Sequence, residues 1–222
     1  MYLKRIAVPK TWPVERKLTK LITAPLPRVS RELGMPLNVV LKELLNVAAT
    51  SREVKVALKT KRVTVDGKVR EPKFAVGLMD VLSLNDTHYR MMLNKKGKLE
   101  LISISKDEAG MKPCRIVGKT VLKGGVMQYN LHDSGNFTGG KDFKVGDTLV
   151  LSLPARTLLH HISFEKKSFV YLTGGAHIGE GCVVENIKGN KLLCKAGDTL
   201  LETLTRFAFA VGKDKPAITL PG

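Results

Sequence analysis

The chain has 222 residues, of which 43% are apolar and 26% charged, and its 37 Lys and Arg against 20 Asp and Glu give a net charge of +17. These proportions are ordinary for globular proteins, so the composition excludes a chain that is disordered throughout. The apolar runs are far shorter than the ~18 residues of a membrane span, and the sequence predicts neither a membrane segment nor a secretory leader.

The positive charge is concentrated towards the N-terminus. Residues 1–31 carry a net charge of +7 and residues 32–77 carry +4, whereas 78–165 and 166–222 carry +3 each. A cationic surface of this kind binds phosphate backbones with release of counterions. The distribution therefore favours a nucleic-acid partner over the alternative, a solvated charged face.

The three cysteines, Cys114, Cys182 and Cys194, are expected to be small buried residues. They are too few, and odd in number, for a secreted disulfide framework, which favours a reducing, cytoplasmic compartment. The nearest two lie 12 positions apart. Zinc ligands usually come in close pairs, so a zinc site with His177 is not expected.

Residues 1–35 are predicted to form a basic extended arm without a core of its own. Four prolines at positions 9, 13, 25 and 27 exclude a long helix and favour extended backbone. The only tryptophan, Trp12, lies in this segment, where it either stacks on a base or packs into the body of the protein. Packing is the more frequent role of a buried aromatic side chain.

Two helices are predicted after the arm. Apolar residues recur every three or four positions over 36–47, behind Pro36 near the first turn. A second, shorter helix begins at Thr50, which is placed to form a capping box with Glu53. Its basic face carries Arg52, Lys55 and Lys59, and its apolar face carries Val54, Ala57 and Leu58.

Strands dominate the rest of the chain. An Asp-Gly pair at 66–67, flanked by alternating residues, predicts a β-hairpin over 62–69. Beyond residue 78 the period of two predicts strands at Val81–Leu84, Tyr89–Leu93, Leu99–Ile104, Arg115–Leu122, Val126–Leu131 and Thr148–Leu153. A connecting segment is expected over 156–167, then strand 169–172, a Gly-rich loop, strand 182–185, and a last strand and turn over 206–216.

The sequence contains fragments of catalytic motifs, but each lacks a residue or an element that the motif requires. Val117-Gly118-Lys119-Thr120 ends like a phosphate loop, but Pro113 stands where that motif needs glycine. Gly179-Glu180-Gly181 lies between predicted strands, without the helix of a dinucleotide site. His160-His161 has no carboxylate partner at motif spacing. The sequence therefore predicts no catalytic set, no metal site and no cofactor.

Two stretches resemble known RNA-binding modules. Residues 36–72, with Thr50-Ser51-Arg52-Glu53 and Val63 to Val69, resemble the S-four RNA-binding domain, and Phe169 through Gly181 into Val184 looks like a KOW motif. The chain combines a basic arm, the RNA-binding module, a middle β region and the KOW motif. This order resembles, over essentially the whole chain, the archaeal and eukaryotic small-subunit ribosomal protein S-four-e family. The family usually has Gly where this chain has Lys61, a difference that adds charge.

The resemblance implies an α+β fold in four parts. These are an extended basic N-terminal arm (1–35), a small helix, helix, hairpin S-four-like RNA-binding domain (36–88), a central all-β barrel-like domain (89–165) and a C-terminal SH3-like β domain with the KOW motif (166–222). It also implies a structural constituent of the small ribosomal subunit, without enzyme activity, that supports translation. Its partners would be small-subunit rRNA and neighbouring ribosomal proteins, with one copy per subunit, no homo-oligomer and a cytoplasmic, ribosomal location.

The residues expected to contact RNA are basic residues of the arm, the helical module and the KOW region, with one aromatic and one histidine. They are Lys4, Arg5, Lys10, Trp12, Arg16, Lys17, Lys20, Arg28, Arg31, Arg52, Lys55, Lys59, Lys61, Arg62, Lys68, Arg70, Lys73, Lys166, Lys167 and His177. The alternative function is an assembly factor or RNA-modifying enzyme that visits the ribosome. A methyltransferase would need a Gly-rich cofactor loop between strand and helix, whereas residues 78–222 have the pattern of β structure.

Overall fold

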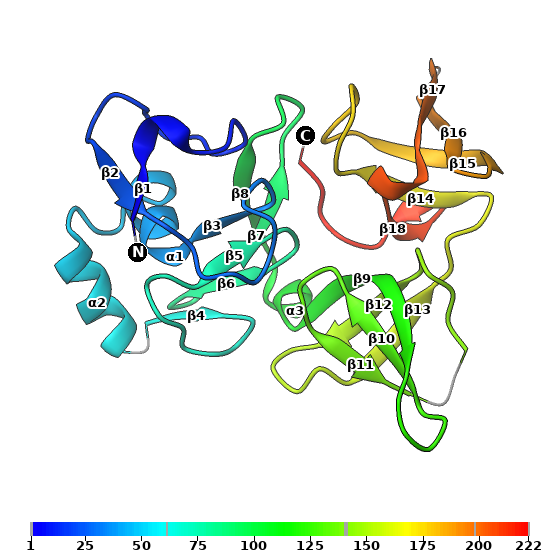
Figure 1. The fold of residues 1–222 in the computed structure, drawn as a ribbon, viewed down its shortest axis with the longest axis horizontal. Helices are drawn as coiled ribbons and strands as arrows, with labels where there is room; N and C mark the ends of the chain where they lie inside the picture. The colour runs from blue at the N-terminus through cyan, green and yellow to red at the C-terminus, as the bar shows by residue number, and fades with distance from the viewer. Residues whose placement is uncertain (1, 61, 140–141, 198, 222) are drawn as a thin grey trace. The chain divides into compact units, whose positions relative to one another are not determined.

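The computed structural model describes residues 2–60, 62–139, 142–197 and 199–221. It is mostly β structure with a few short helices, as Figure 1 shows. Its internal contacts divide it into two compact units, one formed by Met1–Met92 and Lys98–Gly110 and the other by Leu93–Gly97 and Met111–Gly222. Within the described ranges, the helices lack the length and apolar character that crossing a lipid bilayer requires.

The first unit combines small antiparallel sheets with short helices. Strand β1 pairs with β2, β3 pairs with β5, and a four-stranded sheet has the order β4-β6-β7-β8. In chain order the elements are β1 (Tyr2–Lys4), η1 (Arg5–Ala7), β2 (Leu21–Thr23), β3 (Gly34–Pro36), α1 (Leu37–Val39), η2 (Val40–Leu44), α2 (Ser51–Lys59), β4 (Val63–Val65), β5 (Ala75–Gly77), β6 (Val81–Leu84), β7 (Thr87–Leu93), β8 (Leu99–Ile104) and α3 (Lys106–Ala109).

The first 35 residues are packed, and the expectation of an arm without a core is wrong. Val8, Ile22 and Ala24 are buried, and Trp12 is only 2% exposed. The indole Nε1 of Trp12 donates a hydrogen bond of 2.8 Å to the carbonyl oxygen of Arg31. Of the two roles considered for Trp12, the structure shows packing. The prolines exclude a long helix as expected, yet the intervening apolar side chains still find a core.

The first predicted helix is shorter than expected and partly π-helical. Pro36 belongs to β3, and the helical backbone runs from α1 into η2 and ends at Leu44 instead of residue 47. Asn46 then adopts the left-handed backbone with φ 51°. This conformation stops a helix and is tolerated by asparagine, so the apolar periodicity continues past the real end.

The turn at residues 66–67 is present, but the predicted hairpin is not. Asp66 and Gly67 have φ 54° and 72°, as a type I′ turn requires. Val65 and Lys68 exchange two backbone hydrogen bonds of 2.8 and 3.0 Å. Strand β4, however, pairs antiparallel with β6, and the backbone N–H of Asp66 donates to the carbonyl of Val81 at 2.8 Å. A distant strand therefore takes the place of the nearby one.

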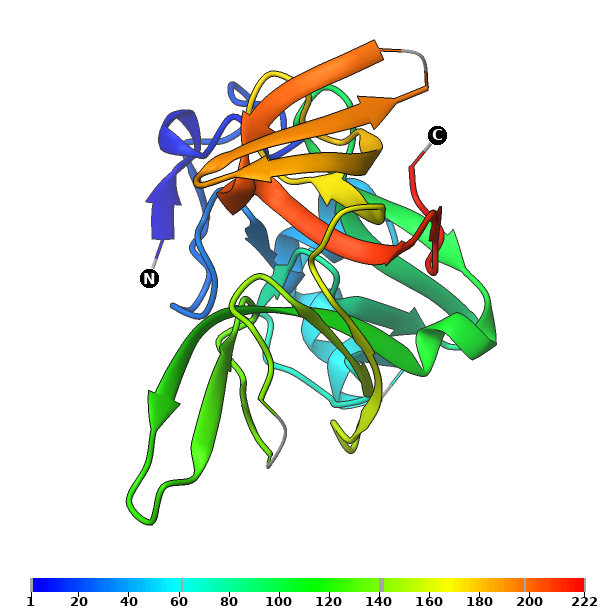
Figure 2. The same cartoon turned by 90° about the vertical axis from the view of Figure 1, so that its right-hand side faces the viewer.

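The second unit is built from two antiparallel sheets, visible in Figure 2 as separate groups of strands. Their orders are β11-β10-β9-β12-β13 and β17-β16-β15-β14-β18-β19. The elements are β9 (Met111–Val121), β10 (Met127–Leu131), β11 (Asn136–Thr138), β12 (Thr148–Ser152), β13 (Leu158–Ile162), β14 (Ser168–Leu172), β15 (Gly181–Lys188), β16 (Lys191–Ala196), β17 (Thr199–Leu204), η3 (Thr205–Phe207), β18 (Ala208–Lys213) and β19 (Lys215–Pro216).

Two of the predicted strands match the structure residue for residue. Strands Val81–Leu84 and Leu99–Ile104 have the predicted bounds. The expected connecting segment over 156–167 is wrong, because it contains β13, an edge strand whose middle three residues are all exposed and so show no alternation. The three cysteines are free and buried, as predicted.

Candidate nucleic-acid interface

Helix α2 is fixed at its start by side-chain capping. The Thr50 hydroxyl accepts a hydrogen bond of 3.3 Å from the backbone N–H of Glu53. The Glu53 carboxylate in turn accepts 2.9 Å bonds from the backbone N–H of Ala49 and from the Thr50 hydroxyl. The bond from Ala49 is the main reason that the pKa of Glu53 lies below its ordinary value. The predicted capping box therefore forms, with the N–H of Ala49 among its donors.

The two faces of α2 separate charge from apolar surface, as predicted. Val54 is fully buried and Leu58 is 5% exposed. On the opposite face the basic side chains of Arg52, Lys55 and Lys59 are exposed. Figure 1 shows α2 at the periphery of the first unit. A rigid helix thus presents three cations to solvent on one side, spaced along about two turns.

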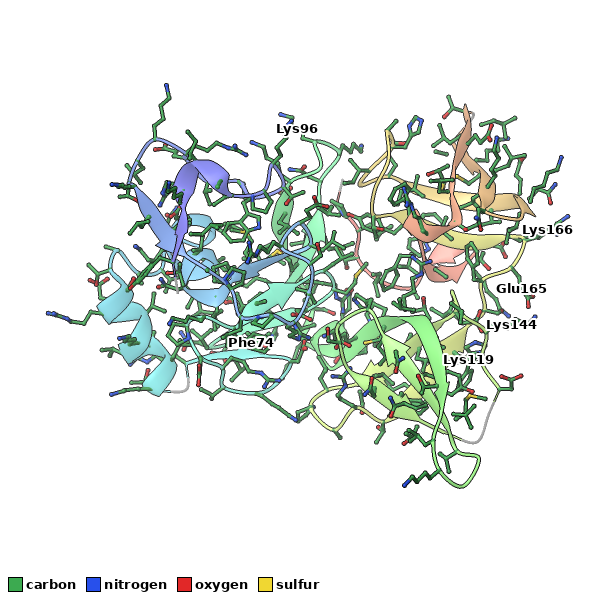
Figure 3. All side chains as sticks on the ribbon, viewed as in Figure 1. Phe74, Lys96, Lys119, Lys144, Glu165 and Lys166 are labelled. Carbon is green, nitrogen blue, oxygen red and sulfur yellow. The ribbon has the colours of Figure 1, made fainter. Side chains whose placement is uncertain are left out.

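Further cations surround Phe74, which Figure 3 labels. The guanidinium carbons of Arg28 and Arg70 lie 4.9 and 4.6 Å from the centre of the Phe74 ring, within cation–π range. Arg28 also forms an ion pair of 2.5 Å with Asp80. Arg28, which is half-buried, is therefore anchored by an acid and a ring, and its charge is partly neutralised.

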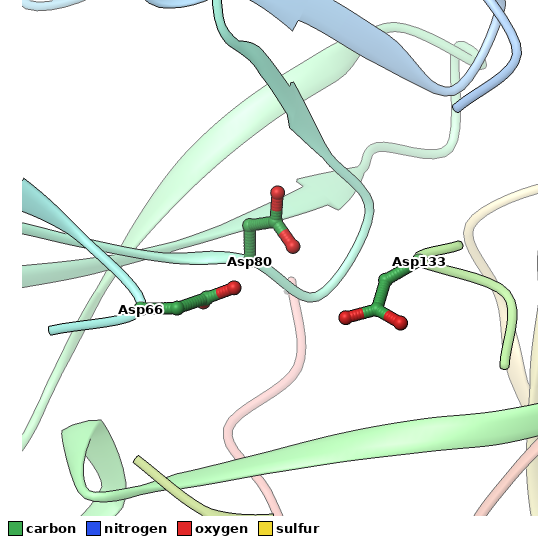
Figure 4. Close-up of side chains that lie close together, drawn as sticks. All are labelled: Asp66, Asp80 and Asp133. Atoms are coloured by element: carbon green, nitrogen blue, oxygen red, sulfur yellow. The ribbon is translucent and has the colours of Figure 1, made fainter. Parts of the chain in front are cut away.

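Buried carboxylates hold the backbone of each unit, and Figure 4 draws three of them. In the first unit, Asp80 accepts a 2.7 Å bond from the backbone N–H of Gly77, and Asp66 accepts a 3.0 Å bond from that of Val81. In the second unit, Asp133 accepts a 3.0 Å bond from the backbone N–H of Gly135 and lies 3.0 Å from the ammonium of Lys112. All of these acids are at most 7% exposed, so they have internal structural partners.

Most of the residues expected to contact RNA face solvent. In the first unit the exposed or half-buried ones are Lys4, Lys10, Arg16, Lys17, Lys20, Arg28, Arg31, Arg52, Lys55, Lys59, Arg62, Lys68, Arg70 and Lys73. In the second unit Lys166 and Lys167 are exposed. His177 is half-buried and lies 3.4 Å from the Glu180 carboxylate. Lys61 lies outside the described residues.

Two of the expected contacts are buried instead. Arg5 is 4% exposed, and its guanidinium forms a two-pronged ion pair of 2.6 and 3.0 Å with Glu43. Trp12 packs into the same unit, as described above. Neither side chain belongs to the solvent-facing cationic surface. Sequence position alone does not reveal this, since Glu43 lies 38 residues away from Arg5.

The second unit carries cations that are not among the residues expected to contact RNA, including Lys119 and Lys144 (Figure 3). Lys119 pairs with Asp142 at 2.6 Å, and this hydrogen bond raises the pKa of the lysine. Lys144 lies 3.8 Å from Glu165. Lys119 belongs to the incomplete phosphate-loop pattern at 117–120, and Lys144 belongs to no motif, so the sequence gives no reason to select either as an RNA contact.

These features define a class of protein: a basic, mostly β chain whose exposed cations suit a phosphate backbone. Comparison with known proteins makes the class specific. The family model described as Ribosomal family S4e matches residues 85–158. The small ribosomal subunit protein eS4 of Methanocella arvoryzae is 38% identical over 227 residues, which cover 98% of this chain and 96% of the relative.

Other relatives agree. The protein of the same name from Methanothermobacter thermautotrophicus is 38% identical over 233 residues, covering 100% of this chain and 96% of the relative. The crystal structure of the 30S ribosomal protein S4e from Thermoplasma acidophilum matches with a TM-score of 0.72 and 30% identity, covering 82% of this chain and 96% of that chain. The chain belongs to the ribosomal protein S4e family, which confirms the resemblance found in the sequence.

Proposed function

We propose that the chain is a structural constituent of the small ribosomal subunit that binds and stabilises folded rRNA and thereby supports translation. The observation that carries this proposal is the extent of the similarity. Proteins named as small ribosomal subunit protein eS4 match 98–100% of this chain, and the match covers 96% of their own length. The whole chain, and not one shared module, is therefore alike.

The exposed cations provide the physical basis for rRNA binding. Arg52, Lys55 and Lys59 on α2 lie where they can contact successive phosphates, and the exposed basic residues of the first 35 positions extend this surface. Such contacts fix position and orientation, while the shape and the 2′-OH groups of folded RNA supply specificity. The proposed contacts are the exposed and half-buried residues named above, without Arg5 and Trp12.

The finer organisation is part of the same proposal. We assign an S-four-like role to residues 36–88, a central β domain to 89–165 and a KOW-containing SH3-like role to 166–222. A strand, a loop with Gly174, Gly175 and Gly179, and a second strand occur at β14 and β15, which supports the KOW assignment. The partners are small-subunit rRNA and adjacent ribosomal proteins, at one copy per subunit, and the role is structural, not enzymatic.

Sedimentation of the native protein tests this function. A cell lysate is separated on gradients at low and high salt, and protein and RNA are measured across the fractions. We expect near-stoichiometric migration with the small subunit that survives high salt. Migration near the top, or a substoichiometric and salt-labile association, would overturn the proposal in favour of a factor or enzyme that visits the ribosome.

A further inference from the structure

The turn that carries Phe74 is fixed by two other segments of the first unit. Within the turn, the backbone N–H of Phe74 donates a 2.9 Å bond to the carbonyl of Glu71. The N–H groups of Leu26 and Leu37 donate 2.8 Å bonds to the carbonyls of Lys73 and Phe74. Because its backbone is bonded to segments distant in the sequence, the half-buried Phe74 ring stands on a rigid support.

Arg70 lies against this ring and has no other partner. Its guanidinium carbon is 4.6 Å from the ring centre, and Phe74 is labelled in Figure 3. Among the described residues, Arg70 forms no hydrogen bond and no ion pair, and its Nε is buried without a partner. The two Nη atoms are not among the buried atoms, so they are open to solvent. The ring therefore orients the guanidinium while the donors of both Nη atoms stay unused.

Arg28, beside the same ring, shows the opposite arrangement. Its guanidinium donates bonds of 2.5 and 3.3 Å to the Asp80 carboxylate and a 3.0 Å bond to the carbonyl of Ala75. The fold itself thus uses the donors of Arg28 and balances its charge with a buried acid. Arg70 differs because no acid within the described ranges compensates it.

The charge around Arg70 favours a polyanion. Residues 68–73 contain the cations Lys68, Arg70 and Lys73 and a single acid, Glu71, so their net charge is +2. Both lysines are exposed, and Glu71 forms no ion pair in the part of the chain that the structure describes. A planar guanidinium with two open Nη groups matches two oxygens of one phosphate, whereas an ammonium acts as a point charge. The lysines suit the neighbouring phosphates of the same strand.

We propose that Arg70 clamps one phosphate of bound rRNA through both Nη groups, and that Phe74 is the positioning residue for this contact. The inference rests on the proposed rRNA-binding function and deepens it. It separates one oriented contact from the exposed cations that act through charge alone. Phe74 acts only through Arg70, so the contact requires arginine at position 70 and an aromatic ring at position 74.

Binding of the full-length protein to small-subunit rRNA tests the clamp. The RNA is purified from cells that express the protein, and affinity is measured by filter binding over a range of salt concentrations. Arg70→Lys keeps the charge but not the planar fork, so we expect about fivefold weaker binding with an unchanged slope of log affinity against log salt. Arg70→Gln removes the charge as well and should reduce that slope by roughly one.

Arg206→Lys is the matched control. The Arg206 guanidinium carbon lies 4.7 Å from the centre of the Phe207 ring, so the stacked geometry is similar. No other charged residue lies within three positions of Arg206, and Arg206 is not among the proposed contacts. This variant should therefore bind rRNA as tightly as the original protein.

A double-mutant cycle tests the positioning role of Phe74. Phe74→Leu should weaken binding about as much as Arg70→Lys, whereas Phe74→Tyr keeps the ring and should keep the affinity. If Phe74 acts through Arg70, the two exchanges combined should cost little more than either one alone. A merely structural role would lower the affinity by the same factor with and without Arg70→Lys. Unfolding midpoints verify the fold, and Phe74→Met replaces Phe74→Leu in the cycle if the latter unfolds.

Unchanged affinity in Arg70→Lys, or additive losses in the cycle, would overturn the inference while the original protein still binds rRNA. Normal binding of Arg70→Lys to purified rRNA, together with poorer incorporation into the small subunit, would assign the guanidinium to a carboxylate of a neighbouring protein and overturn it as well. Failure of the original protein to bind rRNA would overturn the proposed function itself, so the two failures are distinguished.

Discussion

Lys112 and Asp133 illustrate how single residues stabilise the second unit. Both side chains are 1% exposed, and their charged atoms are 3.0 Å apart. Removing one partner of a buried pair leaves the other charge uncompensated, which typically destabilises a protein by about 3–5 kcal/mol. We therefore expect Asp133→Asn to lower the free energy of unfolding by an amount in that range, measured by urea denaturation.

An exposed pair provides the control for that prediction. Asp142 is 84% exposed at the side chain and pairs with Lys119. Solvent screening makes such pairs weak, so Asp142→Asn should change the stability only slightly. Equal decreases of unfolding free energy in the two variants would contradict the distinction between buried and exposed pairs.

The same buried aspartate, Asp133, gives the stability a dependence on acid. Burial raises its pKa, but the nearby charges of Lys112, His132 and Arg156 outweigh burial and hold the pKa well below its ordinary value of 3.8. The ionised Asp133 therefore stabilises the folded protein at pH values above its ordinary pKa. This contribution disappears as the pH falls through the lower pKa that Asp133 has in the folded protein. In Asp133→Asn, the decrease of unfolding free energy below about pH 4 should be smaller.

The fluorescence of Trp12 distinguishes a side chain packed inside the protein from one that stacks on an RNA base. Because it is the only tryptophan and 2% exposed, its fluorescence should have a blue-shifted maximum and resist quenching by iodide. Saturating RNA should leave the emission unchanged, since the indole is already covered. Strong quenching on RNA binding would place a base against Trp12 and contradict the packed geometry.

At the scale of elements, the basic face of α2 makes a quantitative prediction. Replacing Arg52, Lys55 and Lys59 by Ala should weaken RNA binding and reduce the slope of log affinity against log salt by roughly one for each phosphate that the protein no longer neutralises. The matched control exchanges the same three positions as Arg52→Lys, Lys55→Arg and Lys59→Arg. Because counterion release depends on charge, the control variant should keep the salt slope of the original protein. An unchanged slope in the alanine variant would show that the RNA binds elsewhere.

The success of the sequence interpretation depends on how local each element is. Helix α2 was predictable because its cap and both faces are set by residues within one short segment, from Thr50 to Lys59. The turn at Asp66 was predictable for the same reason. Strand β4 was not paired correctly, because its partner β6 is separated from it by more than ten residues and no local pattern names that partner.

The candidate site shows the same limit. The exposure of Lys55 follows from helix periodicity. The burial of Arg5 depends on Glu43, which lies 38 residues away, so it arises only when distant segments meet. A pattern with a period of two or 3.6 contains no information about such meetings.

At the scale of the whole molecule, the first 31 residues decide whether the basic end is an appendage or part of a fold. The sequence alone predicts that their removal leaves a folded body that assembles poorly. The structure predicts a different result, because Val8, Trp12, Ile22 and Ala24 are buried and Arg5 and Arg28 form ion pairs with acids beyond the segment. A buried Val, Ile or larger apolar side chain contributes about 1.5–3 kcal/mol.

Three such side chains therefore account for about 5–9 kcal/mol, a large share of the roughly 5–15 kcal/mol that stabilises a typical domain. We expect the chain lacking residues 1–31 to lose one cooperative unfolding transition, measured by calorimetry. A variant with Lys10, Lys17 and Lys20 replaced by Gln should keep that transition, since these side chains are solvent-accessible, and should bind RNA more weakly. An unchanged melting profile in the truncated chain would show that the segment is an appendage, because its buried side chains would then contribute nothing to the cooperative core.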